Sequence, residues 1–112
     1  MLEIINHGNV REVRMARPPV NALNTELVEQ LMQSLQLAAK QSDAVVISGR
    51  EGLFSAGLDV SDLIQLDHDG MTIFWTLYCE LLETVACSPV PVAAAITGHS
   101  PAGGAVVCLM CD

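Results

Sequence analysis

Positive charge is scarce in this chain of 112 residues, which has 5 lysines and arginines against 13 aspartates and glutamates and a net charge of -8. The cations are scattered along the chain and form no basic patch: Arg11, Arg14, Arg17, Lys40 and Arg50. Because clustered lysine and arginine bind nucleic acids and anionic lipid surfaces, we expect no nucleic acid and no membrane as a partner. A polyanionic small ligand would depend on backbone dipoles and a few of these cations.

Long apolar runs are also missing. No run reaches about 18 residues, the length that a membrane-spanning helix needs, so the sequence predicts no membrane span. Aromatic residues make up only 4% of the chain, yet 51% is hydrophobic and 16% is charged, a composition typical of a globular chain. This is more apolar than a small domain needs. We therefore expect some apolar surface to be covered by a partner or by further chain.

Cysteine occurs four times, always in an apolar segment. Cys108 and Cys111 have the C-x-x-C spacing of some metal and redox sites, but no second ligand pair accompanies them. We interpret them as small hydrophobic side chains and predict no metal site. Four apparently free thiols and no recognisable signal peptide favour a reducing compartment, so we expect a cytoplasmic protein.

Apolar periodicity predicts strands that alternate with helices. We expect strands over residues 2–6, 10–15, 43–49 and 92–96, helices over 25–40 and 71–86, a polar loop over 67–70, and a short turn near 63–64. Residues 103–110 fit either a strand or a buried helix. This order indicates an α/β fold.

Two turns rich in small residues follow buried strands, over residues 54–59 and 98–104. Small side chains let a ligand approach the backbone and leave N–H groups free to donate. Both turns lie at the carboxyl ends of strands, where open α/β sheets tend to bind ligands. Together they could direct two N–H groups at one oxygen atom and form an oxyanion hole. Alone, each pattern is also typical of an ordinary turn.

Three motifs in order resemble the crotonase (enoyl-CoA hydratase/isomerase) superfamily over essentially the whole chain. They are Arg17-Pro18-Pro19-Val20-Asn21-Ala22-Leu23-Asn24, Phe54-Ser55-Ala56-Gly57-Leu58-Asp59, and Pro101-Ala102-Gly103-Gly104 with Cys111-Asp112. The resemblance implies a spiral core of ββα units, incomplete at the C-terminus. Residues 1–112 would form the N-terminal part of one crotonase-like domain, without the C-terminal remainder and its trimerisation helices. It further implies acyl-CoA thioester substrates, no cofactor besides the coenzyme A of the substrate, and a homotrimer or hexamer for the full-length protein.

The resemblance also assigns site residues. The N–H groups of Ala56 and Gly103 would form the oxyanion hole. The coenzyme A moiety would lie against a larger set: Val20, Ala22, Leu23, Ser55, Gly57, Leu58 and Asp59. Phe74 and Trp75 could line the acyl pocket. Phe74 belongs to the helical apolar stripe, and the flanking Trp75 and Tyr78 could either join the core or form the wall of an apolar tunnel.

One departure from the family pattern bears on the reaction. Hydratases of the family carry a glutamate three residues after the oxyanion glycine, where this chain has Val106. Their second glutamate would lie beyond Asp112. The motifs are most similar to the Δ3,Δ2-enoyl-CoA isomerase branch, so we expect isomerisation of 3-enoyl-CoA to 2-trans-enoyl-CoA. The alternatives are an enoyl-CoA hydratase, another acyl-CoA hydrolase or lyase, and a non-catalytic CoA-binding homologue. We expect no turnover from residues 1–112 alone.

Overall fold

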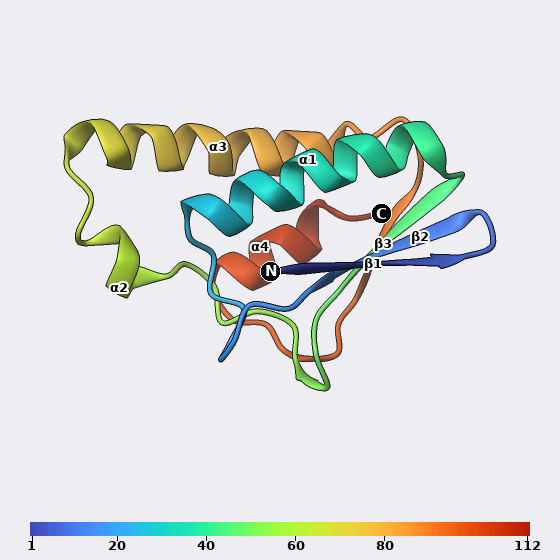
Figure 1. Ribbon diagram of the computed structural model, residues 1–112, viewed down its shortest axis with the longest axis horizontal. Coiled ribbons are helices and arrows are strands. Elements are labelled where there is room, and N and C mark those ends of the chain that lie inside the picture. The colour runs from blue at the N-terminus through green and yellow to red at the C-terminus, as the bar shows by residue number, and fades with distance from the viewer.

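A computed structural model describes residues 1–112 (Figure 1). In chain order the elements are β1 (Leu2–His7), β2 (Val10–Met15), α1 (Thr25–Gln41), β3 (Ala44–Ser48), β4 (Gly52–Leu53), α2 (Val60–Leu63), α3 (His68–Ala86), β5 (Val92–Ala95), β6 (Gly98–His99) and α4 (Gly103–Met110). The four longer strands and both long helices are present and lie within three residues of their predicted bounds.

The main sheet has the strand order β1-β2-β3-β5. β1 and β2 form an antiparallel hairpin in which Leu2 faces Met15. β2, β3 and β5 are parallel, with Val13 opposite Ile47 and Ile47 opposite Ala94. Each parallel connection passes through a long helix, and α1 and α3 pack side by side over the same face of the sheet (Figure 1).

The core lies between that face and the two helices. Strand residues alternate between the faces, so Val13 and Met15 point inward while Glu12 and Arg14 line the opposite face. Apolar residues recur at helical spacing on the facing sides of both helices. The fully buried large side chains include Leu27, Leu31, Phe74 and Leu81 from the helices and Val45 and Ile47 from β3.

A second, two-stranded parallel sheet brings the two small-residue turns together. Gly52 of β4 pairs with Gly98 of β6. A Cβ atom at Gly98 would lie 2.0 Å from the Gly52 carbonyl carbon, so only glycine allows this approach. Residues 54–59 follow β4 and residues 100–102 follow β6. The turns are therefore neighbours in space although they are more than 40 residues apart in sequence.

Two local features refine the predicted elements. The loop predicted at 67–70 is wrong, because α3 already begins at His68, where the Asp67 carboxylate accepts a hydrogen bond from the Gly70 N–H at 2.7 Å. Residues 103–110, which were ambiguous, form helix α4. None of the helices combines the length and the apolar character that crossing a membrane requires.

Candidate functional site

The first and second motifs run alongside each other and share backbone hydrogen bonds. The Leu23 N–H donates to the Gly57 carbonyl at 2.7 Å, and the Asp59 N–H donates to the Leu23 carbonyl at 2.9 Å. The Ala56 N–H donates to the Val20 carbonyl, also at 2.9 Å. Three main-chain bonds thus join the segment after β2 to the segment after β4.

The buried side chain of Asn21 also connects these two segments by hydrogen bonds. Its side chain is 2% exposed. Its amide group donates to the carbonyls of Met15 at 3.1 Å and Phe54 at 3.0 Å, and its Oδ1 accepts from the Arg17 N–H at 2.8 Å. The backbone has a φ of +51°, which asparagine tolerates better than most residues. Every polar atom of this side chain is therefore used to hold the first motif in place.

Arg17 adds an ionic connection between the two motifs. Its guanidinium donates to the Asp59 carboxylate at 2.6 Å and to the Ala22 carbonyl at 2.8 Å. The Asp59 carboxylate also caps α2 by accepting from the Asp62 N–H at 3.1 Å. The Arg17 guanidinium lowers the pKa of Asp59 below its ordinary value. Asp59 is thus a charged structural residue whose carboxylate is already occupied.

Two backbone N–H groups lie together at the meeting point of the turns without an acceptor. Neither the Leu58 N–H nor the Gly103 N–H donates a hydrogen bond within the protein. The two peptides are in contact, because a Cβ atom at Gly103 would lie 3.3 Å from the Leu58 nitrogen. Gly57 makes this approach possible, since it has a φ of +92° and a Cβ there would lie 3.0 Å from the Gly103 nitrogen. Such a pair can donate twice to one oxygen atom.

The Gly103 N–H also lies at the first residue of α4, the positive end of the helix dipole. The preceding residue, Ala102, has a φ of +50° and provides no side-chain cap. Non-glycine residues in this region cost on the order of 1–3 kcal/mol and cluster at functional sites. The first N–H of α4 has no intrahelical acceptor, as at the start of every α-helix, and no side chain caps it here.

Of the two N–H groups predicted for the oxyanion hole, the structure leaves only one free to bind a ligand. Gly103 has an available N–H, but the N–H of Ala56 is already bonded to the Val20 carbonyl. In this conformation Ala56 cannot donate to a ligand, and Leu58, which was predicted only as a coenzyme A contact, has the unused N–H beside Gly103. The two neighbouring N–H groups that lack an acceptor are therefore those of Leu58 and Gly103, and not those of Ala56 and Gly103.

Burial also limits the predicted coenzyme A contacts. Ser55 is 0% exposed and Leu23 is 1% exposed. The Ser55 hydroxyl donates to the Asn21 carbonyl at 2.7 Å and accepts from the Gly57 N–H at 3.1 Å. Both side chains are internal supports of the motif. Val20, Ala22, Leu58 and Asp59 are half-buried and remain reachable from outside.

The two aromatic residues predicted for the acyl pocket differ in exposure. Phe74 is fully buried in the core, so the prediction for its side chain is corrected, whereas Trp75 is 46% exposed. Tyr78, one helical turn after Phe74, was considered as a possible pocket wall but was not assigned a bond to the site. Its hydroxyl donates to the Gly103 carbonyl at 3.2 Å. The Tyr78 hydroxyl, a polar group beside an apolar helix stripe, could have suggested a hydrogen bond. Its partner is 25 residues away in sequence and could not be identified from the pattern.

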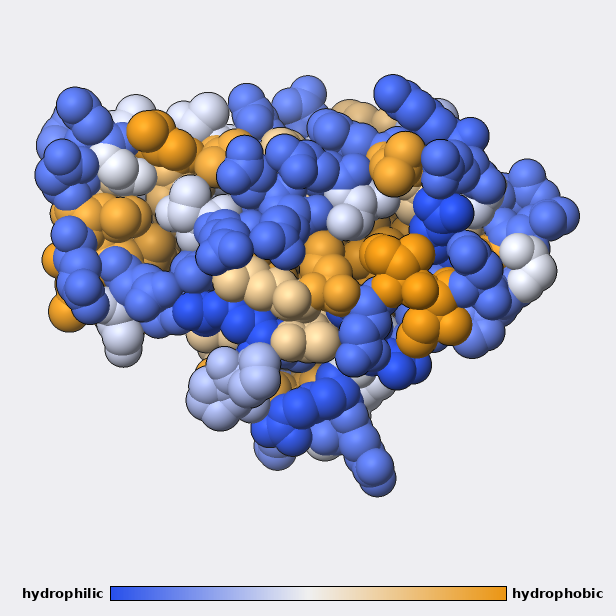
Figure 2. Space-filling model, in the orientation of Figure 1, coloured by the Kyte–Doolittle hydropathy of each residue, from blue (hydrophilic) through white to orange (hydrophobic).

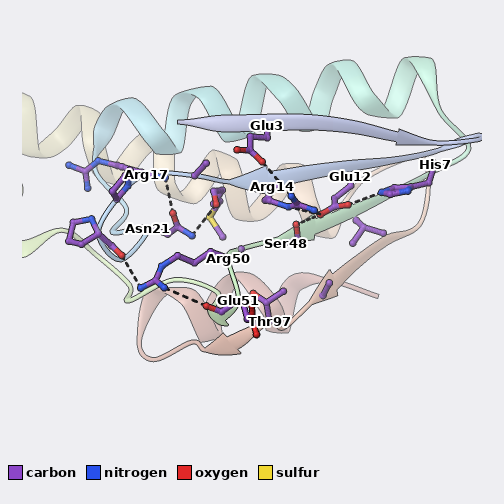
Figure 3. Close-up of a pocket in the computed structure, with 17 residues that line it drawn as sticks. Glu3, His7, Glu12, Arg14, Arg17, Asn21, Ser48, Arg50, Glu51 and Thr97 are labelled. Atoms are coloured by element: carbon purple, nitrogen blue, oxygen red, sulfur yellow. Dashed lines mark hydrogen bonds and ion pairs between the residues drawn. The ribbon is translucent and has the colours of Figure 1, made fainter.

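A cavity of about 940 Å³ lies elsewhere, on the face of the sheet that the helices leave open (Figure 3). None of the predicted site residues lines it, although Arg17 and Asn21 of the first motif do. Its polar residues include Glu3, His7, Glu12, Arg14, Ser48 and Arg50.

Glu12 is the centre of a hydrogen-bonded cluster in this cavity (Figure 3). Its carboxylate accepts from the Ser48 hydroxyl at 2.6 Å and from the Arg14 guanidinium at 3.0 Å, and it lies 2.7 Å from His7 Nε2. The Ser48 and His7 hydrogen bonds lower the pKa of Glu12 from 4.5 to about 2. The cluster joins β1, β2 and β3 on the open face of the sheet.

Glu12→Gln is expected to lower the free energy of unfolding by about 1–3 kcal/mol at neutral pH, because it removes charge-assisted hydrogen bonds. A carboxylate whose pKa is lowered by folding stabilises the folded state above its unfolded pKa. This contribution is lost as the pH falls from 4.5 toward about 2. The difference between the variant and the unsubstituted protein, measured by urea unfolding, should shrink over that range.

Glu3→Gln is the matched control for Glu12, because the Glu3 side chain is 57% exposed and contacts Arg14 only at 3.4 Å. Its effect is expected to stay below about 1 kcal/mol. A Glu12→Gln effect that is constant between neutral pH and pH 2 would contradict the role given to the carboxylate.

Comparison with known proteins gives a consistent result. The chain matches the family profile described as enoyl-CoA hydratase/isomerase over residues 6–112. It is 29% identical to the mitochondrial enoyl-CoA delta isomerase 1 of Rattus norvegicus, over 100% of this chain and 40% of that protein. It is 34% identical to the probable enoyl-CoA hydratase echA6 of Mycobacterium tuberculosis, over 100% of this chain and 45% of that protein. The chain thus spans less than half the length of these relatives.

The fold agrees with the sequence similarity. The structure of human mitochondrial delta3-delta2-enoyl-CoA isomerase superposes with a TM-score of 0.93 at 30% identity, over 99% of this chain and 45% of that one. An enoyl-CoA hydratase from Bacillus anthracis superposes with a TM-score of 0.90 at 25% identity, over 99% of this chain and 45% of that one. The predicted α/β crotonase-like fold is therefore confirmed.

Proposed function

Because this chain belongs to the enoyl-CoA hydratase/isomerase family, we propose that it forms the oxyanion site of an acyl-CoA enzyme that converts 3-enoyl-CoA to 2-trans-enoyl-CoA. The observation that carries the proposal is the adjacent pair of unused N–H groups on Leu58 and Gly103. Two donors directed at one oxygen are the element that thioester enolate chemistry requires.

The proposed reaction begins with loss of a proton from C2 of the thioester. A thioester α-proton is only weakly acidic, and its removal moves negative charge onto the carbonyl oxygen. In the proposal that oxygen accepts hydrogen bonds from the Leu58 and Gly103 N–H groups, whose strength grows with the charge. The positive end of α4 acts in the same direction.

The shift of the double bond is completed when the same proton returns at C4, a task that one carboxylate can perform. Val106 occupies the position at which family hydratases carry a glutamate, and valine cannot transfer a proton. The Asp59 carboxylate is bound to Arg17 at 2.6 Å. We therefore assign no base within these residues. The lack of a carboxylate at 106 supports isomerisation over hydration, and it also supports the alternative of a non-catalytic CoA-binding homologue.

The remaining proposed contacts follow the reachable surfaces of the motifs. The coenzyme A moiety would run along Ala22, Leu58 and Asp59, next to the donor pair. The exposed Trp75 would contact the acyl chain, because its ring lies 5.9 Å from that of Tyr78, which bonds to Gly103. No other cofactor is part of the proposal.

Apolar side chains remain on the surface over α2 and the start of α3, at the left of Figure 2. Val60 is 64% exposed, Ile64 is 74% exposed and Ile73 is 55% exposed. Exposed apolar surface of this kind is typical of an interface. It supports the proposal that the full-length protein assembles into a homotrimer or hexamer.

The test is an assay of the full-length gene product with 3-enoyl-CoA and with 2-enoyl-CoA. We expect the 3-enoyl thioester to be converted to the conjugated 2-trans product, which absorbs in the ultraviolet, with little hydration. Addition of water to 2-enoyl-CoA without a shift of the 3-enoyl double bond would contradict isomerase activity. Tight acyl-CoA binding with no turnover of either thioester would favour the non-catalytic homologue. Residues 1–112 alone are expected to show no turnover.

A further inference from the structure

The hydroxyl of Tyr78 lies next to the donor pair but is not part of it. It donates to the Gly103 carbonyl at 3.2 Å, and a Cβ atom at Gly103 would lie 3.3 Å from it. The residue is 5% exposed, and burial raises its pKa above the ordinary value of 10.0. The hydroxyl therefore keeps its proton and remains a donor throughout the neutral range.

The Tyr78 ring is itself held in a fixed position. It stacks on Phe74 with a centroid distance of 6.0 Å and an interplanar angle of 10°. Trp75 meets it edge to face at 5.9 Å and 78°. These partners precede Tyr78 by four and three residues, the spacing at which side chains meet on one face of a helix. The hydroxyl is thus presented from a rigid part of α3 and not from a loop.

The first turn of α4 has no other side-chain anchor. Ala102 supplies no capping hydrogen bond. Among residues 103–106, the Gly103 carbonyl is the only backbone atom that bonds to a side chain. Glycine has the widest choice of backbone dihedrals, so a bond to its carbonyl restricts a peptide that its own side chain cannot fix.

We propose that Tyr78 is a positioning residue of the oxyanion site: by holding the Gly103 carbonyl it limits rotation about the φ and ψ angles of Gly103, and so keeps the N–H of the preceding peptide in its direction. This inference rests on the proposed function. Oxyanion stabilisation depends on donors that are already aligned before charge develops. Loss of the phenol oxygen should therefore weaken polarisation of the thioester carbonyl and leave the remaining binding contacts intact.

The test uses infrared difference spectra of a saturated acyl-CoA, labelled with carbon-13 at the thioester carbonyl, bound to the full-length protein. In the unsubstituted protein we expect the carbonyl stretch to shift to lower frequency than in solution, because two N–H groups polarise it. In Tyr78→Phe we expect about half of that shift and a kcat about tenfold lower, with KM for 3-enoyl-CoA changed by less than about twofold. Thr76→Val is the matched control, since it removes an exposed hydroxyl from the same helix that bonds only to the Thr72 carbonyl.

The outcomes separate the two proposals. An unshifted stretch in the unsubstituted protein overturns the oxyanion site and this inference with it. A normal shift that Tyr78→Phe retains in full overturns only the role of Tyr78. If Tyr78→Phe does not fold, 3-fluorotyrosine at position 78 replaces it, because it keeps the ring and donates a stronger hydrogen bond. A larger shift of the stretch then supports the inference, and an unchanged one overturns it.

Discussion

Replacing the peptide N–H of residue 58 with an ester oxygen is expected to lower kcat by about 10²–10³-fold, the usual cost of losing one oxyanion donor. The change is made in the full-length protein with the 2-hydroxy acid analogue of leucine, which keeps the Leu58 side chain. The Leu58 N–H has no acceptor in the protein, so its removal breaks no internal hydrogen bond. The ester also makes the Gly57 carbonyl a weaker acceptor for the Leu23 N–H. We expect this to lower the free energy of unfolding by about 0.5 kcal/mol.

An ester at residue 56 is the matched control for the ester at 58, two residues away in the same turn. The Ala56 N–H donates to the Val20 carbonyl at 2.9 Å, so its loss should cost about 1 kcal/mol of stability. We expect kcat to stay within about threefold of the unsubstituted enzyme, because no transition-state donor is lost. The opposite pattern, with kcat lost at residue 56 and kept at residue 58, would return the donor role to Ala56.

The position of the donor could not be read from the motif alone. The Ala56 N–H donates to the Val20 carbonyl and the Asp59 N–H donates to the Leu23 carbonyl, both in the first motif. Between them, the positive φ of Gly57 turns the chain, and the Leu58 N–H is left without an acceptor. This register comes from the pairing of Leu23 with Leu58, residues 35 positions apart. The motif located the turn, and the pairing between segments determined which N–H is unused.

Most of the fold followed from local patterns that the sequence displays directly. The alternation in β2 and the helical stripe of α1 each require only near neighbours, so both were predicted within a few residues. The start of α3 was misplaced because Asp67, His68 and Asp69 read as a solvated loop, while the Asp67 carboxylate caps the helix instead. Polar residues at a helix start and in a loop look alike without the backbone.

The burial of the predicted site residues also could not be predicted from the sequence. Ser55 could have faced a ligand or the core, and its position was settled by Asn21, 34 residues earlier. Phe74 and Trp75 are adjacent on one helix, yet they differ from 0% to 46% in exposure. Which of two neighbours faces the core depends on where α1 and α4 pack against α3. Such contacts are long-range, and periodicity alone does not predict them.

Asn21→Ala is expected to produce the largest loss of stability, about 3–4 kcal/mol, because it removes two buried hydrogen bonds and one partly buried one. The carbonyls of Met15 and Phe54 and the N–H of Arg17 would each lose a partner in the interior. Alanine must also adopt the φ of +51°, which asparagine accepts more readily. Urea unfolding at neutral pH measures the effect. Asn24→Ala is the control from the same motif. It removes a helix cap and an exposed hydrogen bond to Asp62, and should cost only about 1 kcal/mol.

Two further substitutions at Asn21 separate the sources of that loss. Asn21→Gly removes the same three hydrogen bonds but accepts a positive φ, so it should be about 1 kcal/mol more stable than Asn21→Ala. Asn21→Asp places a carboxylate against the carbonyls of Met15 and Phe54, so it should be the least stable variant at neutral pH. At low pH the protonated acid can again donate to one of these carbonyls, and part of the loss should be recovered. An Asn21→Asp protein as stable as the unsubstituted one at neutral pH would show that the side-chain amide does not hold these segments together. The Phe54 carbonyl lies four residues before Leu58, so the same bond that stabilises the fold also fixes the turn that carries the proposed donor.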